Sequence, residues 1–330
     1  MTQLILDRFG RFRTPPTFAG AAGPRERGVL RLAGFLLSAT AAAGATALLV
    51  ALAITLCAAV PLAKARSIGL LEAIPLALDP GAGPRPLLSY GFELGVAGLA
   101  SYAAALAILG LAIAFYRRPA RSFLTEAPRF RWRLVAVGLA VGAVVIGAAL
   151  ATQSLVADTP RAAPLLRPGE SLGGRLGYAG LAAACLYLAA LAEEIIFRGV
   201  LLQLSAAFTR SLPLILAING ILFSLAHFDP DPSAMIIRLL MGAGWAWIAL
   251  RSGGIELTTG VHLANNLMIS LFLTPLSFKP ATPEKLDPVA IAIELGTVLA
   301  CVAAVEALVR RKERREAAAG GLAAAEEPAE

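Results

Sequence analysis

Residues 32–63 read LAGFLLSATAAAGATALLVALAITLCAAVPLA and contain no Asp, Glu, Lys or Arg. A helix of about 20 apolar residues crosses the hydrocarbon core of a bilayer, so this stretch is long enough to span a membrane. A polar, Arg-rich segment precedes it, in place of the short basic region and small-residue cleavage site of a secretory signal. We therefore interpret residues 32–63 as a retained first span.

Further apolar runs follow along the whole chain of 330 residues, of which 58% are hydrophobic. The mean hydropathy of +0.73 exceeds that of ordinary soluble domains. These runs predict an all-α, polytopic membrane protein with about eight transmembrane helices, near residues 32–62, 94–116, 134–157, 176–205, 212–228, 236–250, 255–276 and 289–309. The sixth is short for a span, with Arg238 expected to snorkel at one end and Trp245 and Trp247 at the other interface.

The distribution of polar residues divides the chain into four parts. We predict a basic cytoplasmic segment over 1–31, scaffold helices over 32–175, a catalytic core of five helices over 176–309, and a cytoplasmic tail over 310–330. The scaffold is rich in Ala, Gly, Leu and Val, which favour close helix packing. The tail is Ala-rich and acidic after Glu316, a composition typical of disorder.

Basic residues indicate the orientation of the helices. With an internal N-terminus, 19 Lys and Arg fall on cytoplasmic segments and 8 on external loops. The positive-inside rule therefore places both termini in the cytoplasm, and we expect a bacterial plasma membrane protein in contact with lipids. The net charge of +7 arises from these flanking blocks, so nucleic acid is not an expected partner. Cys57, Cys185 and Cys301 lack metal-ligand or disulfide spacing.

Residues 191–198, LAEEIIFR, place charged residues within an apolar stretch. Glu194 and Arg198 are four apart and share one helical face, which favours an ion pair that neutralises both charges. Glu193 lies about 100° away around the helix and is left for another partner. Charged groups in membrane spans usually mark a functional site.

The chain has two histidines, and each lies in a later apolar stretch. His227 follows Phe223 by four residues and comes just before Pro230 and Pro232, which should end the helix. His262 and Asn266 share one face of the seventh span, whereas Asn265 points elsewhere and suits contact between helices.

Helical rise places these groups at similar depths. Measured from the turn near Thr209, Glu193 stands at ~24 Å and His227 at ~27 Å, while His262 and Asn266 stand ~16 and ~22 Å from Arg251 on the same side. Helix tilt could then bring all four together.

A carboxylate, two imidazoles and a carboxamide in a shielded site suit hydrolysis. Glu193 would take a proton from water, and the histidines and Asn266 would stabilise the oxyanion. Glu193, His227 and His262 would also form a two-histidine, one-carboxylate zinc site, although no His-Glu-x-x-His motif is present. The Gly-x-Ser-x-Gly pattern at 169–173 lies in a loop without the context of a nucleophile elbow.

At these positions the chain resembles the CAAX-processing and bacteriocin-processing (CPBP or Abi) family of intramembrane proteases. The resemblance rests on Glu-Glu-x-x-x-Arg at 193–198, Phe-x-x-x-His at 223–227 and His-x-x-x-Asn at 262–266, in the family order and within about residues 176–276. It implies Glu193 as the water-activating base, His227 as its partner, and His262 with Asn266 on the oxyanion or metal side. The family is described both as metalloproteases and as glutamate-dependent proteases, so a Zn²⁺ cofactor stays open.

Three functions follow from these residues. The first is an intramembrane endopeptidase acting on a membrane-associated or lipidated protein or peptide. The second is an ion- or proton-coupled transporter that uses the same Glu and His residues, although two halves with matching broken helices are missing. The third is a non-catalytic assembly or immunity protein. The family implies prenylated C-termini for some members and peptide maturation for others, and the sequence does not indicate the substrate or the oligomeric state.

Overall fold

The computed structural model describes residues 17–20, 22–23, 25–78, 86–156, 163–276 and 286–325. Within these ranges the chain is helical and contains no strand, with one isolated β-bridge between Thr125 and Gly254. The elements are α1 (Thr17–Gly20), α2 (Val29–Arg66), α3 (Leu70–Leu78), η1 (Leu87–Tyr90), α4 (Gly91–Gly95), η2 (Val96–Ala100), α5 (Ser101–Tyr116), α6 (Arg121–Leu124), α7 (Trp132–Val156), η3 (Pro164–Leu166), α8 (Leu172–Glu194), η4 (Ile195–Leu201), α9 (Leu202–Phe208), α10 (Leu212–Leu225), α11 (Pro232–Ser252), α12 (Glu256–Phe272) and α13 (Pro288–Ala325).

All eight predicted apolar segments form helices, and six helical stretches within the described ranges are long and apolar enough to cross a membrane. The chain is thus an all-α, multi-pass membrane protein. The prediction that the sixth span is short was wrong, because α11 extends over 21 residues. Its N-terminus is extended by Asp231, whose carboxylate accepts a hydrogen bond from the N–H of Ala234, and by Pro232 in the first turn. Helices α10, with 14 residues, and α12, with 17, are shorter than these six stretches.

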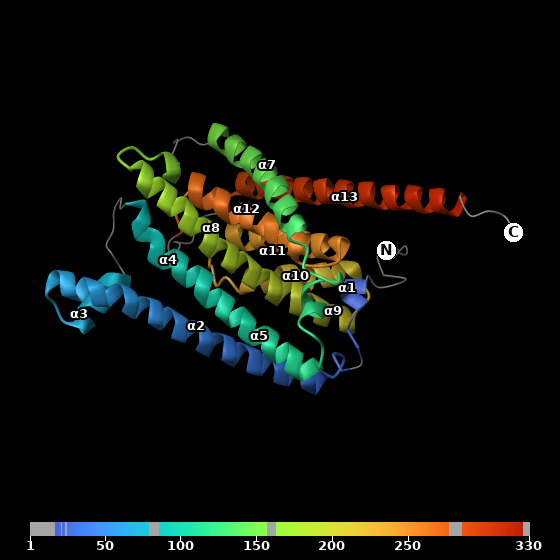
Figure 1. Cartoon of the computed structure of the whole chain (residues 1–330), viewed down its shortest axis with the longest axis horizontal. Helices are drawn as coiled ribbons and strands as arrows, with labels where there is room; N and C mark the ends of the chain where they lie inside the picture. The colour runs from blue at the N-terminus through green and yellow to red at the C-terminus, as the bar shows by residue number, and fades with distance from the viewer. Residues whose placement is uncertain are drawn as a thin grey trace.

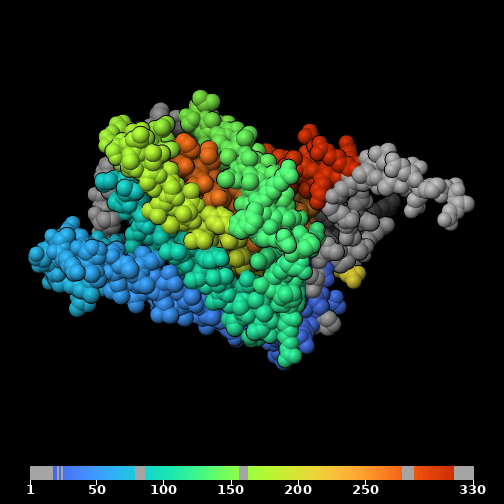
Figure 2. All heavy atoms as spheres, viewed as in Figure 1, coloured from blue at the N-terminus to red at the C-terminus, as the bar shows by residue number. Residues whose placement is uncertain are grey.

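The helices form a layered bundle in which α2 lies at one edge and α12 lies in the interior (Figure 1). Helix α2 packs against α5, α5 packs against α8, and α12 lies between α7 and α8. On the other side, α11 contacts α10 and α13. In the space-filling view, α12 (orange) shows only as a small area between α7 (green) and α8 (yellow-green) (Figure 2).

Helices α7 and α12 approach each other closely because glycines form the contact. A Cβ atom added to Gly138 would meet the carbonyl oxygen of Leu257, and one added to Gly260 would meet that of Val135. One turn after Gly138, a Cβ on Gly142 would lie 2.6 Å from the Cβ of Ala264. Small residues four apart allow two backbones to touch, as they do between membrane helices. The scaffold helix α7 therefore holds α12 in place along much of its length.

The tail differs from its prediction. Helix α13 continues to Ala325, whereas disorder was expected after Glu316; Ala, Glu and Arg are all favourable in helices. Residues 326–330 lie outside the described residues, as do residues 1–16, 21, 24, 79–85, 157–162 and 277–285. The predicted cytoplasmic location of both termini, which depends on basic residues in several of these segments, stays a prediction.

The pattern at 169–173 has a structural role. The Ser171 hydroxyl accepts a hydrogen bond from the N–H of Gly174 and caps α8, while a carboxylate oxygen of Glu170 accepts one from the N–H of Leu87. Gly169 adopts a positive φ of 84° in the preceding turn. These contacts agree with the prediction that this Gly-x-Ser-x-Gly is not a nucleophile elbow.

The α7–α12 contact predicts a difference between two glycines. Gly138→Ala forces a methyl group against the backbone of α12, and overpacking of this kind typically costs about 1–3 kcal/mol. We expect a lower midpoint of thermal unfolding in detergent. Gly110→Ala on α5 is the matched control, because nothing lies within 4 Å of its added Cβ. Equal midpoints for the two variants would contradict the proposed packing.

Candidate active site

The first part of the site lies on a continuous helix made of α8, η4 and α9. Glu193 and Glu194 end the α-helical part, and Arg198 lies in η4, which is π-helical. Such wider turns are rare and often occur at functional sites. A guanidinium nitrogen of Arg198 lies 3.1 Å from Oε1 of Glu194, and both side chains are fully buried. The structure thus confirms the ion pair predicted from their spacing.

Glu194 also binds a histidine, which the sequence did not indicate. Its Oε1 atom lies 2.9 Å from Nδ1 of His262 on α12. Arg198 extends the network, because it donates a hydrogen bond of 3.2 Å to the carbonyl of Gly242 on α11. Its guanidinium also lies 4.6 Å from the centre of the Phe223 ring on α10. The buried pair therefore connects the helix of Glu193 to α10, α11 and α12.

Glu193 faces both histidines without bonding either one. Its Oε2 atom lies 3.6 Å from Nε2 of His262 and 3.9 Å from Nε2 of His227. This oxygen is buried and has no hydrogen-bond partner among the described residues. An unpaired buried carboxylate oxygen is costly, so its position between two ring nitrogens points to a site for a water molecule or a substrate atom. Glu193 and His227 are 25% and 29% exposed, so the site is open on this side.

The rings of both histidines are oriented by their Nδ1 atoms. Nδ1 of His227 lies 2.8 Å from the carbonyl oxygen of Phe223, one helical turn earlier. A carbonyl can only accept, so this nitrogen carries a proton. Nδ1 of His262 likewise donates to the carboxylate of Glu194. Both Nε2 atoms are consequently directed toward Glu193, and each has either a lone pair or a second proton to offer.

His227 lies just beyond its helix. Helix α10 ends at Leu225, before the prolines that we expected to end it. The N–H of His227 donates to the carbonyl of Ser224 in a turn, and Phe228 then adopts a positive φ of 50°. The left-handed residue ends the helix in the way that a C-terminal cap does. The Phe-x-x-x-His spacing still orients the His227 ring, because it places the Phe223 carbonyl oxygen within hydrogen-bonding distance of Nδ1.

Asn266 is half-buried on α12, one turn beyond His262. Its carbonyl oxygen lies 3.4 Å from the amide nitrogen of the neighbouring Asn265. Among the described residues, no hydrogen bond links Asn266 to Glu193 or to either histidine. Its contact with reacting atoms stays a prediction.

Aromatic residues enclose the site. Trp245 is 3% exposed, and its ring centre lies 4.4 Å from that of His262. The expectation that this tryptophan lies at a membrane interface was wrong, because α11 is longer than predicted and buries its middle. Phe223 packs edge-to-face on His227 at 4.8 Å. These rings exclude water from the Glu194 side of the histidines.

Arg238 pairs with Asp229 near the open side, at 2.8 Å, instead of extending alone to an interface. Partial burial raises the pKa of Asp229, but the N–H of Asp231 and the guanidinium of Arg238 stabilise its carboxylate more, so its pKa lies below the usual value. Asp229 is therefore ionised at neutral pH and anchors the segment that follows His227.

The donor set of Glu193, His227 and His262 has the chemistry of a zinc site. Within the described part of the chain, however, no group of three or more His, Cys, Asp or Glu side chains is arranged to hold a metal ion.

The buried network predicts a large effect of removing one partner. Breaking a buried ion pair from one side typically costs 3–5 kcal/mol, so Arg198→Leu should reduce the free energy of unfolding by about that amount. The double variant Arg198→Leu with Glu194→Gln should be more stable than Arg198→Leu, because no unpaired charge is left. Arg310→Leu is the control, since Arg310 forms a pair of the same spacing with Glu306 but is 65% exposed. A loss for Arg198→Leu as small as that of the control would contradict the network.

Comparison with known proteins agrees with this arrangement. Residues 176–268 match the family described as type II CAAX prenyl endopeptidase Rce1-like. The chain is also 30% identical over 175 residues to the uncharacterized protein YyaK of Bacillus subtilis (strain 168), an alignment that covers 50% of this chain and 56% of the relative. The chain thus spans about half the length of this curated relative. No solved structure matches it. The matched segment contains Glu193, Glu194, Arg198, His227, His262 and Asn266, and this match supports a relationship to the CPBP/CAAX family of intramembrane proteases.

Proposed function

We propose that this chain is an intramembrane endopeptidase that cleaves a membrane-associated or lipidated protein or peptide. The observation that carries the proposal is the unbonded Oε2 atom of Glu193, which faces the Nε2 atoms of His262 and His227 at 3.6 and 3.9 Å. The match of residues 176–268 to a protease family favours this function over a transporter or an assembly protein. We also propose a bacterial plasma membrane as its location, in line with the relative from Bacillus subtilis.

The proposed reaction begins at a water molecule beside Oε2 of Glu193. The water oxygen attacks the carbonyl carbon of the scissile bond while Glu193 takes its proton. The carbonyl oxygen becomes an oxyanion, which Asn266 and the Nε2–H group of His262 stabilise. Collapse of this intermediate breaks the C–N bond, and Glu193 returns the proton to the leaving nitrogen. Base and acid are thus the same carboxyl group.

The histidines can donate to the oxyanion only from Nε2, because Nδ1 is already engaged in each ring. Donation from Nε2 requires that the ring carry both protons. His262 lies between the carboxylates of Glu193 and Glu194 and is 3% exposed, so we assign this role to His262. His227 is more exposed and lies beside the Glu193 carboxylate, and we assign it to orienting the water.

Replacement of the base tests the proposal. General base catalysis typically contributes 10²–10⁴-fold, so Glu193→Gln should lower kcat by about that factor while the protein stays folded in the membrane. The measurement is cleavage of a fluorogenic, membrane-anchored peptide in proteoliposomes. Glu72→Gln on α3, with its carboxylate exposed, is the control. Unchanged cleavage by a folded Glu193→Gln protein would rule out the assignment.

Asn266 and its neighbour provide a second comparison. Loss of one oxyanion donor typically costs 10²–10³-fold in kcat, so Asn266→Ala should fall by about that factor with little change in KM. Asn265→Ala removes only the 3.4 Å contact that the Asn265 amide makes with the Asn266 carbonyl oxygen and should lower kcat much less. If Asn265→Ala lost as much as Asn266→Ala, the oxyanion role would be wrong.

Chelation separates the two mechanisms described for the family. Because the carboxylate of Glu193 acts directly on water in our proposal, prolonged treatment with EDTA or 1,10-phenanthroline should leave the cleavage rate unchanged. Loss of activity that stoichiometric Zn²⁺ restores would instead require a metal held by Glu193, His227 and His262. Profiling cleavage products in the same samples would identify the substrate class.

A further inference from the structure

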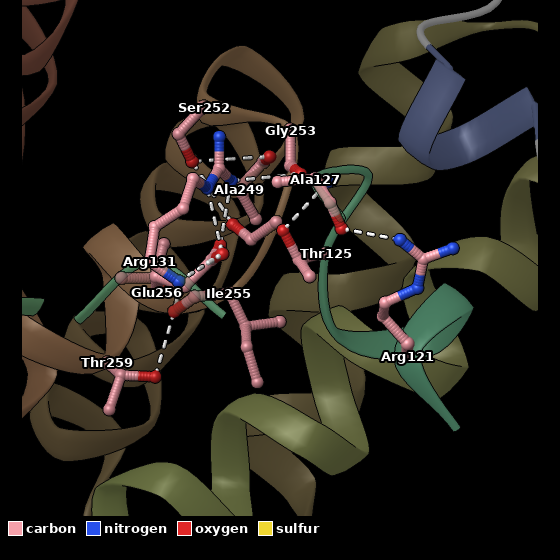
Figure 3. A network of polar contacts seen from close by, with 12 residues as sticks. Arg121, Thr125, Ala127, Arg131, Ala249, Ser252, Gly253, Ile255, Glu256 and Thr259 are labelled. Carbon is pink, nitrogen blue, oxygen red and sulfur yellow. Dashed lines mark hydrogen bonds and ion pairs between the residues drawn. The ribbon is translucent and has the colours of Figure 1, made fainter. Parts of the chain in front are cut away.

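The turn that leads into α12 is held by the connector between α5 and α7. The N–H of Ile255 donates to the carbonyl of Leu124 at 2.9 Å, and the N–H of Glu126 donates to the carbonyl of Gly253 at 3.0 Å. The turn requires glycine, since Gly253 has a positive φ of 71°. Residues from both segments meet in one polar network (Figure 3). The start of α12 is thus attached to a segment more than 100 residues away in the sequence.

Arg131 and Glu256 form the centre of this network. Nε and one terminal nitrogen of Arg131 each lie 2.8 Å from a carboxylate oxygen of Glu256, a two-pronged contact. The backbone N–H of Arg131 adds a bond of 3.2 Å, and its side chain also donates to the carbonyl of Gly253 at 3.1 Å. Glu256 is fully buried, and Arg131 is 24% exposed. Two-pronged pairs of this kind fix both distance and orientation.

Glu256 is the first residue of α12, and His262 follows six residues later. At 1.5 Å per residue, the two side chains are separated by about 9 Å along one rigid helix. Near its other end, α12 is fixed by the Tyr178 hydroxyl of α8, which lies 2.6 Å from the Ser270 hydroxyl. A slide of α12 by one residue, about 1.5 Å, would break the 2.9 Å contact between His262 and Glu194.

We propose that Arg131 and Glu256 are positioning residues for the active site, which set the depth of His262 relative to Glu193 and Glu194. The effect of this pair on catalysis rests on the proposed function. Its effect on the position of His262 rests on geometry alone. Arg131 precedes the segment that matches the protease family, so the scaffold contributes to the site through this pair. Neither residue touches Glu193 or the reacting atoms.

The two histidines provide a test that needs no turnover. Protein labelled with [¹⁵N]histidine and purified without a histidine tag gives signals from two imidazoles, and His227→Gln assigns them. Arg131→Lys keeps the charge but cannot make the two-pronged contact. We expect the Nδ1 resonance of His262 to shift in Arg131→Lys and in Glu256→Gln, while that of His227 stays in place. Arg133→Lys is the matched control, because Arg133 is an exposed arginine in the first turn of α7, and it should shift neither signal.

Kinetics give the second readout. A misplacement of about 1 Å can cost 10²-fold in rate, so kcat of Arg131→Lys should fall by tenfold to a hundredfold while KM stays near its original value. Unmoved His262 signals in both folded variants would overturn the proposal, whatever the activity. Equal shifts of both histidines would also overturn it, because they would indicate general loosening. If Glu193→Gln retained activity, the proposed function would fail while the NMR result would still decide the positioning role.

Discussion

A carboxylate fully removed from solvent, that of Glu194, holds the site together. Its charge would be very unfavourable inside a membrane protein without compensation. Arg198 neutralises it at 3.1 Å, and Nδ1 of His262 donates to the same oxygen at 2.9 Å. Because Nδ1 is engaged there, Nε2 of His262 has to face the other way, toward Glu193. The adjacent glutamates thus have separate tasks: Glu194 orients the ring, and Glu193 is left unbonded beside it.

The sequence predicted the helices from long apolar runs, and it predicted the convergence of Glu193, His227 and His262 from the similar depths that helical rise gives them. An i, i+4 spacing is simpler still, because it depends on local geometry alone. The sequence also predicted the Glu194–Arg198 pair for this reason. It could not predict the bond between Glu194 and His262, since similar depths do not show which of two adjacent carboxylates an imidazole on another helix will contact. The burial of Trp245 was missed for a related reason: hydropathy does not distinguish a helix face in lipid from one in the protein interior.

Helix ends were the least accurate part of the prediction. The prolines at 230 and 232 indicated where α10 should stop, but the left-handed Phe228 follows a helix that ends at Leu225. Pro232 begins α11 instead, behind the capping carboxylate of Asp231. The same proline can end one helix or begin the next, and the side chains around it decide between these outcomes.

The position of α12 links the scaffold to the chemistry. Glycine contacts with α7, the Arg131–Glu256 pair at its start and the Tyr178–Ser270 contact near its end all restrict its movement. By contrast, α2 lies at the edge of the bundle, and few of its residues are buried (Figure 1). A helix that presents His262 to two glutamates needs a defined depth, whereas a peripheral helix does not.

The central claim is that both histidines are fixed through Nδ1 and direct Nε2 toward Glu193. Solid-state NMR of the [¹⁵N]histidine-labelled protein in liposomes, recorded as the pH is raised until both rings are neutral, measures this directly. The account predicts that each neutral ring keeps its proton on Nδ1. A neutral His227 or His262 with its proton on Nε2 would contradict the account, because that ring could not make its observed contact with the Phe223 carbonyl or the Glu194 carboxylate.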